Sequence, residues 1–127
     1  MKRAYLPPIL LLSVMLALSL WNGSRITRDT ERWRSQLEHV DTLAQAKQWP
    51  ESIAALEDSH RDWQGRQTYL HLVTEHAVLD DAEAMYHRAA AFARERETAE
   101  FRAEIQHLRH QLTLMAEMER FSIKNVL

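Results

Sequence analysis

The sequence contains no cysteine, only two glycines (Gly23 and Gly65) and only three prolines (Pro7, Pro8 and Pro50). Without cysteine, disulfide frameworks, cysteine-based zinc sites, thiol nucleophiles and lipid attachment through a thiol are excluded. Sheets and tight hairpins need glycine and proline at their turns, so the scarcity of both argues against them. Good helix formers such as Ala, Leu, Glu, Arg and Gln are frequent instead. The composition therefore predicts an all-α protein.

A strong charge of either sign is also missing. The chain has 16 Lys and Arg against 18 Asp and Glu, a formal net charge of −2. Because no basic stripe runs along the chain to meet a phosphate backbone, we expect no nucleic-acid partner. Glycine-rich phosphate loops and nucleophile elbows are absent as well. We therefore expect no enzyme activity and no cofactor.

One long uncharged run is present, AYLPPILLLSVMLALSLW, from residue 4 to residue 21. As a helix it would be about 27 Å long, just enough for a hydrocarbon core of about 30 Å. Pro7 and Pro8 stand where the first helical turn tolerates a missing N–H. Trp21 would then lie at the far membrane interface, a favoured depth for an indole. The sequence predicts a single-pass anchor that contacts membrane lipid.

The same run permits other interpretations. A cleaved signal peptide would need small residues before the cut, and the best candidate, Ala17-Leu18-Ser19, precedes the bulky Leu20 and Trp21. A buried core helix fits less well, because the other predicted helices are amphipathic. The orientation is open, since basic residues flank both ends of the run. The short basic head, Lys2 and Arg3, favours a cytoplasmic N-terminus with the rest of the chain outside.

Behind an anchor of residues 1–22, residues 23–127 are predicted to form a helical domain. Apolar residues recur every three to four positions in two long stripes. These are Ile26, Trp33, Leu37, Val40 and Ala44, and then Phe101, Ile105, Leu108, Leu112 and Met115. The sequence thus predicts a helix at each end of the domain.

Between these two stripes, residues typical of helix ends predict further helices. Pro50 fits the start of a second helix and Gly65 its end. After a short third helix, Asp80 and Asp81 suit the first turn of a fourth. The charged stretch RERET leaves open whether residues 79–120 form one helix or two.

The expected fold is an N-terminal transmembrane helix followed by a small bundle or stack of four to five helices. Short connections between amphipathic helices favour helix-hairpin packing. The stretch from Gln45 to Trp63 has the alanine and aromatic placement of a tetratricopeptide-type hairpin, but no 34-residue period repeats it.

Tryptophan and histidine are the candidate site residues. Trp33, Trp49 and Trp63 suit helix packing, although one or two of them could be exposed as a partner-binding hot spot. His60 and His76 fall on apolar stripes. There we expect a polar position in the core, a half-buried imidazole bonded to a backbone carbonyl or a helix end.

A metal site is not expected, although two spacings resemble those of metal-binding helices. Glu104 and His107 have the Glu-x-x-His spacing of di-metal bundles, and Glu83 and His87 form an i, i+4 pair. Helical geometry, however, turns His107 away from the predicted core. A second inward-facing motif is lacking, so the sequence predicts no metal ligands.

The chain resembles the bacterial domain-of-unknown-function family DUF4363 over nearly its whole length. The resemblance lies in the basic head with one apolar segment, the pair Asp62-Trp63, the stretch HLVTEHAVLDD (residues 71–81) and the ending EMERFSIKNVL (residues 117–127). The family usually has a turn pair such as Gly-Asp between its last two helices, where this chain has RERET. The resemblance implies a small anchored helical domain at a bacterial cell membrane, with no assigned catalytic residue. Some members are encoded beside multi-spanning membrane proteins, which implies a membrane partner.

The sequence leads to two hypotheses of function. The first is a membrane-anchored, non-catalytic accessory protein whose helical domain lies outside and binds a membrane protein or a copy of itself. The alternative is a secreted soluble helical protein that binds a ligand or a metal after signal cleavage.

Overall fold

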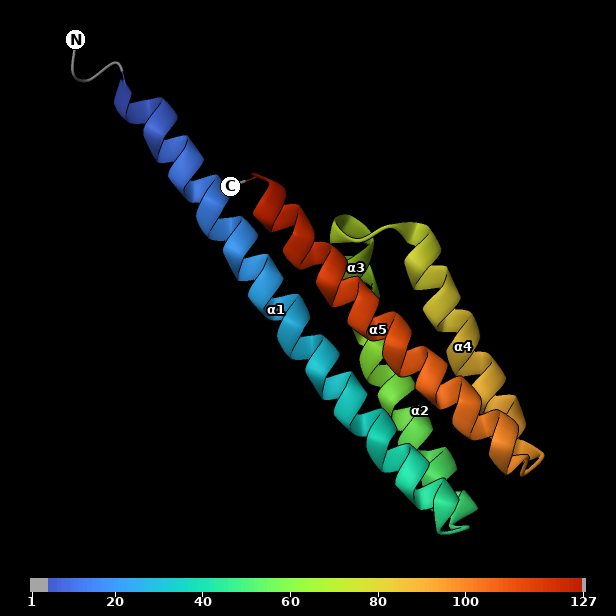
Figure 1. The fold of residues 1–127 in the computed structure, drawn as a ribbon. Coiled ribbons are helices and arrows are strands. Elements are labelled where there is room, and N and C mark those ends of the chain that lie inside the picture. The colour runs from blue at the N-terminus through green and yellow to red at the C-terminus, as the bar shows by residue number, and fades with distance from the viewer. Residues whose placement is uncertain (1–4, 127) are drawn as a thin grey trace.

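The computed structural model describes residues 5–126, apart from the side chains of a few residues in α3 and the last turns of α5. Lys2 and Arg3, the basic residues that predict a cytoplasmic N-terminus, lie outside the described residues. Within residues 5–126 the chain forms five helices and no strand (Figure 1). They are α1 (Leu6–Gln45), α2 (Trp49–Gly65), α3 (Gln67–Val73), α4 (His76–Arg94) and α5 (Thr98–Val126). The predicted all-α fold is confirmed.

The four long helices form an antiparallel bundle. Helices α1 and α2 make one hairpin, and α4 and α5 make the second. Helix α1 packs against α2 and α5, and α4 packs against α5 and α2, which closes the bundle. The short α3 connects the two hairpins. Of the two predicted arrangements, bundle and stack, the structure has the bundle.

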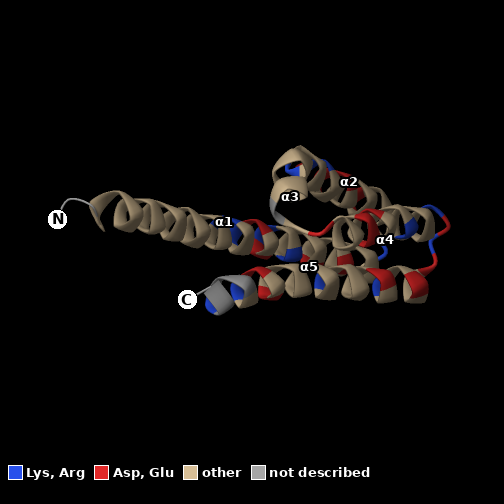
Figure 2. Cartoon of the chain, turned by 90° about the horizontal axis from the view of Figure 1, so that it is seen from above, with Lys and Arg blue, Asp and Glu red and all other residues tan. Residues whose placement is uncertain are grey.

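Helix α1 runs without a break from the apolar segment into the bundle. It continues through the predicted boundary between residues 22 and 23, and its N-terminal part extends beyond the other helices (Figure 1). That part carries no charged side chain, whereas the bundle carries both positively and negatively charged side chains along its length (Figure 2). Because a continuous helix has no hinge residue, the apolar segment and the bundle share one axis.

The two hairpin turns are closed in the same way. Lys47 (φ 60°) and Arg96 (φ 54°) adopt the left-handed conformation just after α1 and α4. The amide of Gln48 donates to the carbonyl of Leu43, and that of Glu97 donates to Phe92, as in a glycine-ended helix. Residues 95–97, inside the stretch RERET, therefore form a turn without a glycine, and residues 79–120 belong to two helices.

The predicted stripes of α1 and α5 face each other across the core. All ten of their residues are buried, from Ile26 on α1 to Met115 on α5. Helix α4 adds small side chains at Ala82, Ala89 and Ala93, which permit close approach of its neighbours. Helix α4 begins at His76, so Asp80 and Asp81 lie one turn later than the sequence predicts.

Candidate functional site

The three candidate partner-binding tryptophans lie in the core. Trp33 and Trp63 are fully buried and Trp49 is 4% exposed. The rings of Trp33 and Trp63 meet edge to face with centroids 5.2 Å apart, and Trp49 meets Phe101 in the same way at 5.4 Å. The structure corrects the suggestion of an exposed hot spot, because burial in the core leaves these rings no surface for a partner.

The two candidate core histidines lie in different environments. The His60 side chain is 20% exposed, and its Nε2 lies 2.8 Å from Glu83 Oε1, so its partner is a carboxylate and not a backbone carbonyl. His76 is exposed at the start of α4, where its Nδ1 lies 2.8 Å from Nδ1 of the exposed His71. The expected half-buried position is thus incorrect for His76, because α4 begins there and turns its first residue to solvent.

Glu83 on α4 is the centre of a polar cluster between α2 and α4. Besides His60, it has His87 Nε2 at 3.1 Å from Oε1 and Trp63 Nε1, which donates to Oε2 at 2.9 Å. Burial alone would raise the pKa of Glu83, but the hydrogen bond and charge of His60 and the hydrogen bond from Trp63 outweigh it, so the pKa lies below its ordinary value. A carboxylate that stays ionised between two imidazoles can bind a cation.

Sequence reasoning found only part of this cluster. The spacing of Glu83 and His87 is visible as an i, i+4 pair on one helix. His60 comes from α2, 23 residues earlier, and only the packing of α2 on α4 brings it to Glu83. Its position on an apolar stripe was the available signal, because that stripe faces the neighbouring helix.

A second polar cluster joins α1 to α2. Arg32 donates to both carboxylate oxygens of Asp62, at 2.7 and 3.0 Å, and also to Asp29, which is buried on α1. Burial alone would raise the pKa of Asp62, yet hydrogen bonds from Arg32 and Gln36 lower it below its ordinary value. Every charge has an opposite partner here, so the cluster serves to hold the first hairpin together.

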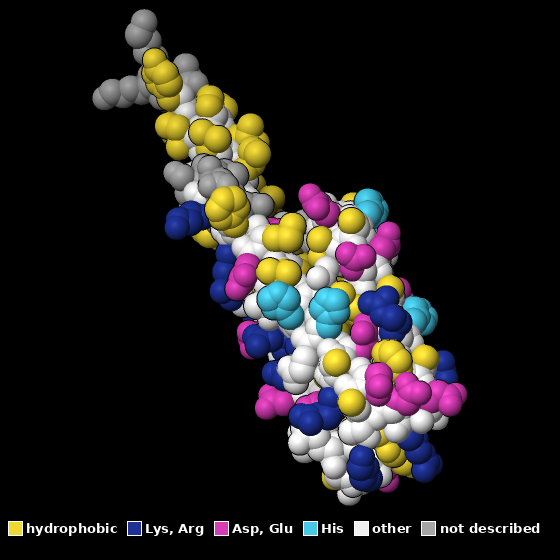
Figure 3. Space-filling model, turned by 45° about the vertical axis from the view of Figure 1, so that its right-hand side comes forward, with side chains coloured by type: hydrophobic (Ala, Val, Ile, Leu, Met, Phe, Trp, Pro, Cys, Tyr) yellow, Lys and Arg dark blue, Asp and Glu magenta, His cyan; other side chains and the backbone are white. Residues whose placement is uncertain are grey.

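The apolar segment of α1 is exposed as far as the bundle. One stretch of α1 is long and apolar enough to cross a membrane, and 6% of it is buried. On the face shown in Figure 3, hydrophobic side chains dominate this segment, whereas charged side chains and histidines are confined to the bundle and the junction with it. Where the two parts meet, the Arg25 guanidinium lies over the rings of Trp21 and Tyr69, at 5.2 and 4.4 Å.

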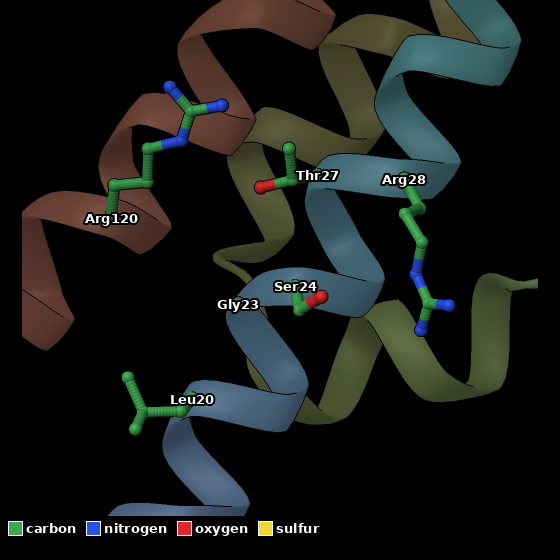
Figure 4. Close-up of a pocket in the computed structure, with 6 residues that line it drawn as sticks. All are labelled: Leu20, Gly23, Ser24, Thr27, Arg28 and Arg120. Carbon is green, nitrogen blue, oxygen red and sulfur yellow. The ribbon is translucent and has the colours of Figure 1, made fainter.

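An open groove between α1 and α5 lies at the same level. It is lined by residues of α1 and by Arg120 of α5, whose side chain lies across from Leu20, Gly23 and Thr27 (Figure 4). The outer face of α5 nearby presents Leu114, Met118 and Phe121, which are 38, 43 and 64% exposed. This group, called here the α5 apolar face, is a surface that no residue of the bundle core covers.

Comparison with known families identifies the chain. The model of the family described as Domain of unknown function (DUF4363) matches residues 20–126. The chain belongs to this family. The match begins at the end of the apolar segment and includes all of α2, α3, α4 and α5. No curated protein and no solved structure gives a significant match.

Proposed function

We propose that this DUF4363 protein is a membrane-anchored, non-catalytic accessory subunit, with residues 4–21 in the bilayer and the bundle outside. The observation that carries the proposal is the continuity of α1, whose exposed apolar segment passes into the buried core without a break. Exposed leucines over a whole helical surface are stable in hydrocarbon and costly in water. Trp21 and Arg25, at the junction, have the residue types found at membrane interfaces.

The α5 apolar face is the proposed contact for a partner. Arg120 on α5 and Leu20 on α1 line one groove, which puts the end of α5 beside the end of the membrane segment. Met118 and Phe121 would therefore stand at the membrane surface, at a height fixed by the rigid α1. We propose that they contact an integral membrane protein, or the same face of a second copy.

A non-catalytic role agrees with the character of the remaining surface. The groove beside Arg120 is wide open to solvent, which does not suit chemistry that must exclude water. The ion pairs of Arg32 with Asp29 and Asp62 are satisfied within the first hairpin. Both features favour a structural and binding role over catalysis.

The experiment is site-specific photocrosslinking of the full-length protein in its native host, followed by extraction in mild detergent and mass spectrometry. A photoreactive phenylalanine at Phe121 should capture a membrane protein or a second copy. The matched control is the same probe at Glu57, which is exposed on α2. Equal capture from both positions, or a lone monomer from Phe121, would contradict the proposal.

A second candidate, a secreted metal- or ligand-binding protein, is favoured by the cluster around Glu83. It requires removal of the apolar segment near Ser19. The intact mass of the protein from its native host separates the two candidates, because retention of Met1 or Lys2 eliminates the secreted form.

A further inference from the structure

We propose that His60, Glu83 and His87 bind one divalent transition-metal cation of the Zn²⁺ type between α2 and α4. The ligand atoms of these three side chains lie within 4.8 Å of one another. No part of this proposal depends on the membrane partner, so the two can fail separately.

The geometry of the three atoms suits a tetrahedral cation. With Zn–N and Zn–O bonds of about 2.0–2.2 Å, neighbouring ligands of tetrahedral zinc lie about 3.3 Å apart. The observed separations from Glu83 Oε1 are 2.8 Å to His60 Nε2 and 3.1 Å to His87 Nε2. These two separations differ from the tetrahedral value by a few tenths of an ångström. All three ligand atoms lie within 4.8 Å of one another, so rotations of the side chains would admit the ion.

Neighbouring side chains hold two of the ligands in place. Trp63 Nε1–H donates to Glu83 Oε2, which fixes the carboxylate and leaves Oε1 directed at the histidines. The His60 ring stacks on Tyr86 with centroids 4.8 Å apart and planes 12° from parallel. The Tyr86 hydroxyl is in turn paired with Ser59 at 2.9 Å. Such supporting contacts orient the ligands of protein metal sites.

The donor set determines the class of cation. Two imidazoles and one carboxylate suit Zn²⁺ and similar cations, whereas Mg²⁺ and Ca²⁺ require mostly oxygen ligands. The side chain of His87 is 68% exposed, so the fourth position faces solvent and can be filled by water. On binding, each imidazole offers the Nε2 lone pair and carries its proton on Nδ1.

Hydrogen bonding alone would also hold these groups together, so the test must detect the metal. The full-length protein in non-ionic detergent, carrying a tag without histidine, is titrated with Zn²⁺ against a chromophoric chelator. We expect one ion per chain, an affinity at least tenfold weaker in His87→Gln, and no effect of His107→Gln, a matched exposed histidine on α5. Zn²⁺ should also raise the melting temperature of the wild type but not of His87→Gln.

Two further measurements separate this site from others. The exposed pair His71 and His76 could bind zinc by itself, so His71→Gln is included and should leave the affinity unchanged. Mg²⁺ at the same concentration should not raise the melting temperature. Unchanged zinc affinity in His87→Gln, or its loss in His71→Gln, would overturn the proposal, as would equal stabilisation by Mg²⁺. Because His87 is exposed, a variant there should keep the zinc-free melting temperature.

Discussion

The edge-to-face pair Trp33 and Trp63 provides a direct measure of what one hydrogen bond contributes to the bundle. Trp33 and Trp63 are both fully buried, and each packs on the other. Trp63 Nε1–H donates to Glu83 at 2.9 Å. Within residues 5–126, Trp33 Nε1–H has no acceptor in hydrogen-bond geometry, although its proximity contributes to the lowered pKa of Asp62. Replacing each by phenylalanine removes similar volume but different polar contacts.

The expected magnitudes follow from these contacts. Loss of ring volume costs about 1 kcal/mol in either variant. Trp63→Phe also removes a hydrogen bond to a charged group, usually about 1.5–3 kcal/mol, and the lower value applies because the Glu83 side chain is 30% exposed and water can replace the donor. Trp33→Phe removes a buried, unpaired N–H, which offsets part of its cost. Trp63→Phe should therefore be less stable than Trp33→Phe by at least about 1.5 kcal/mol. For a domain of this size, that difference lowers the melting temperature by about 6 °C.

The assay is thermal unfolding of the full-length protein in non-ionic detergent, followed by circular dichroism at the helical band. Equal destabilisation by the two variants would refute the reasoning. Glu83→Gln in each background completes a double-mutant cycle, in which coupling should be found with Trp63 and not with Trp33.

Three further predictions concern stability in the same assay. Arg96→Gly should raise stability by about 0.5–1 kcal/mol, because relief of the left-handed backbone exceeds the entropy that glycine adds to the unfolded chain; a loss would contradict the turn. Ala89→Leu should lower the free energy of unfolding by about 1–3 kcal/mol, because the larger side chain overpacks the buried face of α4. Ala91→Leu, on the exposed side of the same helix, should stay within about 0.5 kcal/mol of the wild type. Burial raises the pKa of Glu119, so the folded state binds the proton more tightly and the charged form is disfavoured at neutral pH. Glu119→Gln should thus stabilise by up to about 0.5 kcal/mol at pH 7, and the gain should vanish once pH falls below the unfolded pKa.

The sequence determined the helices and their inward faces. Scarce glycine and proline left helix as the default, and the spacing from Trp33 to Ala44 and from Phe101 to Met115 marked the residues that are buried. A helical period of 3.6 is local information, so it can be read without knowing the neighbours. The apolar segment was visible for the same reason, since length and composition alone define it.

Helix ends were harder to read. Arg96 adopts a conformation that usually needs glycine, so the turn between α4 and α5 carried no glycine signal. The sequence also did not show that one helix runs through the predicted boundary at residues 22–23. Gly23 lies inside α1 without interrupting it.

Only the tertiary structure decided what the polar and aromatic residues do. Trp63 reads as a core or binding residue in the sequence, and it becomes both a core ring and the donor that orients Glu83. His60 reaches Glu83 only because α2 and α4 pack side by side, and His76 stays exposed because a helix begins there. Periodicity tells which face of a helix points inward, but the partner that each side chain meets depends on how the helices are placed around the core.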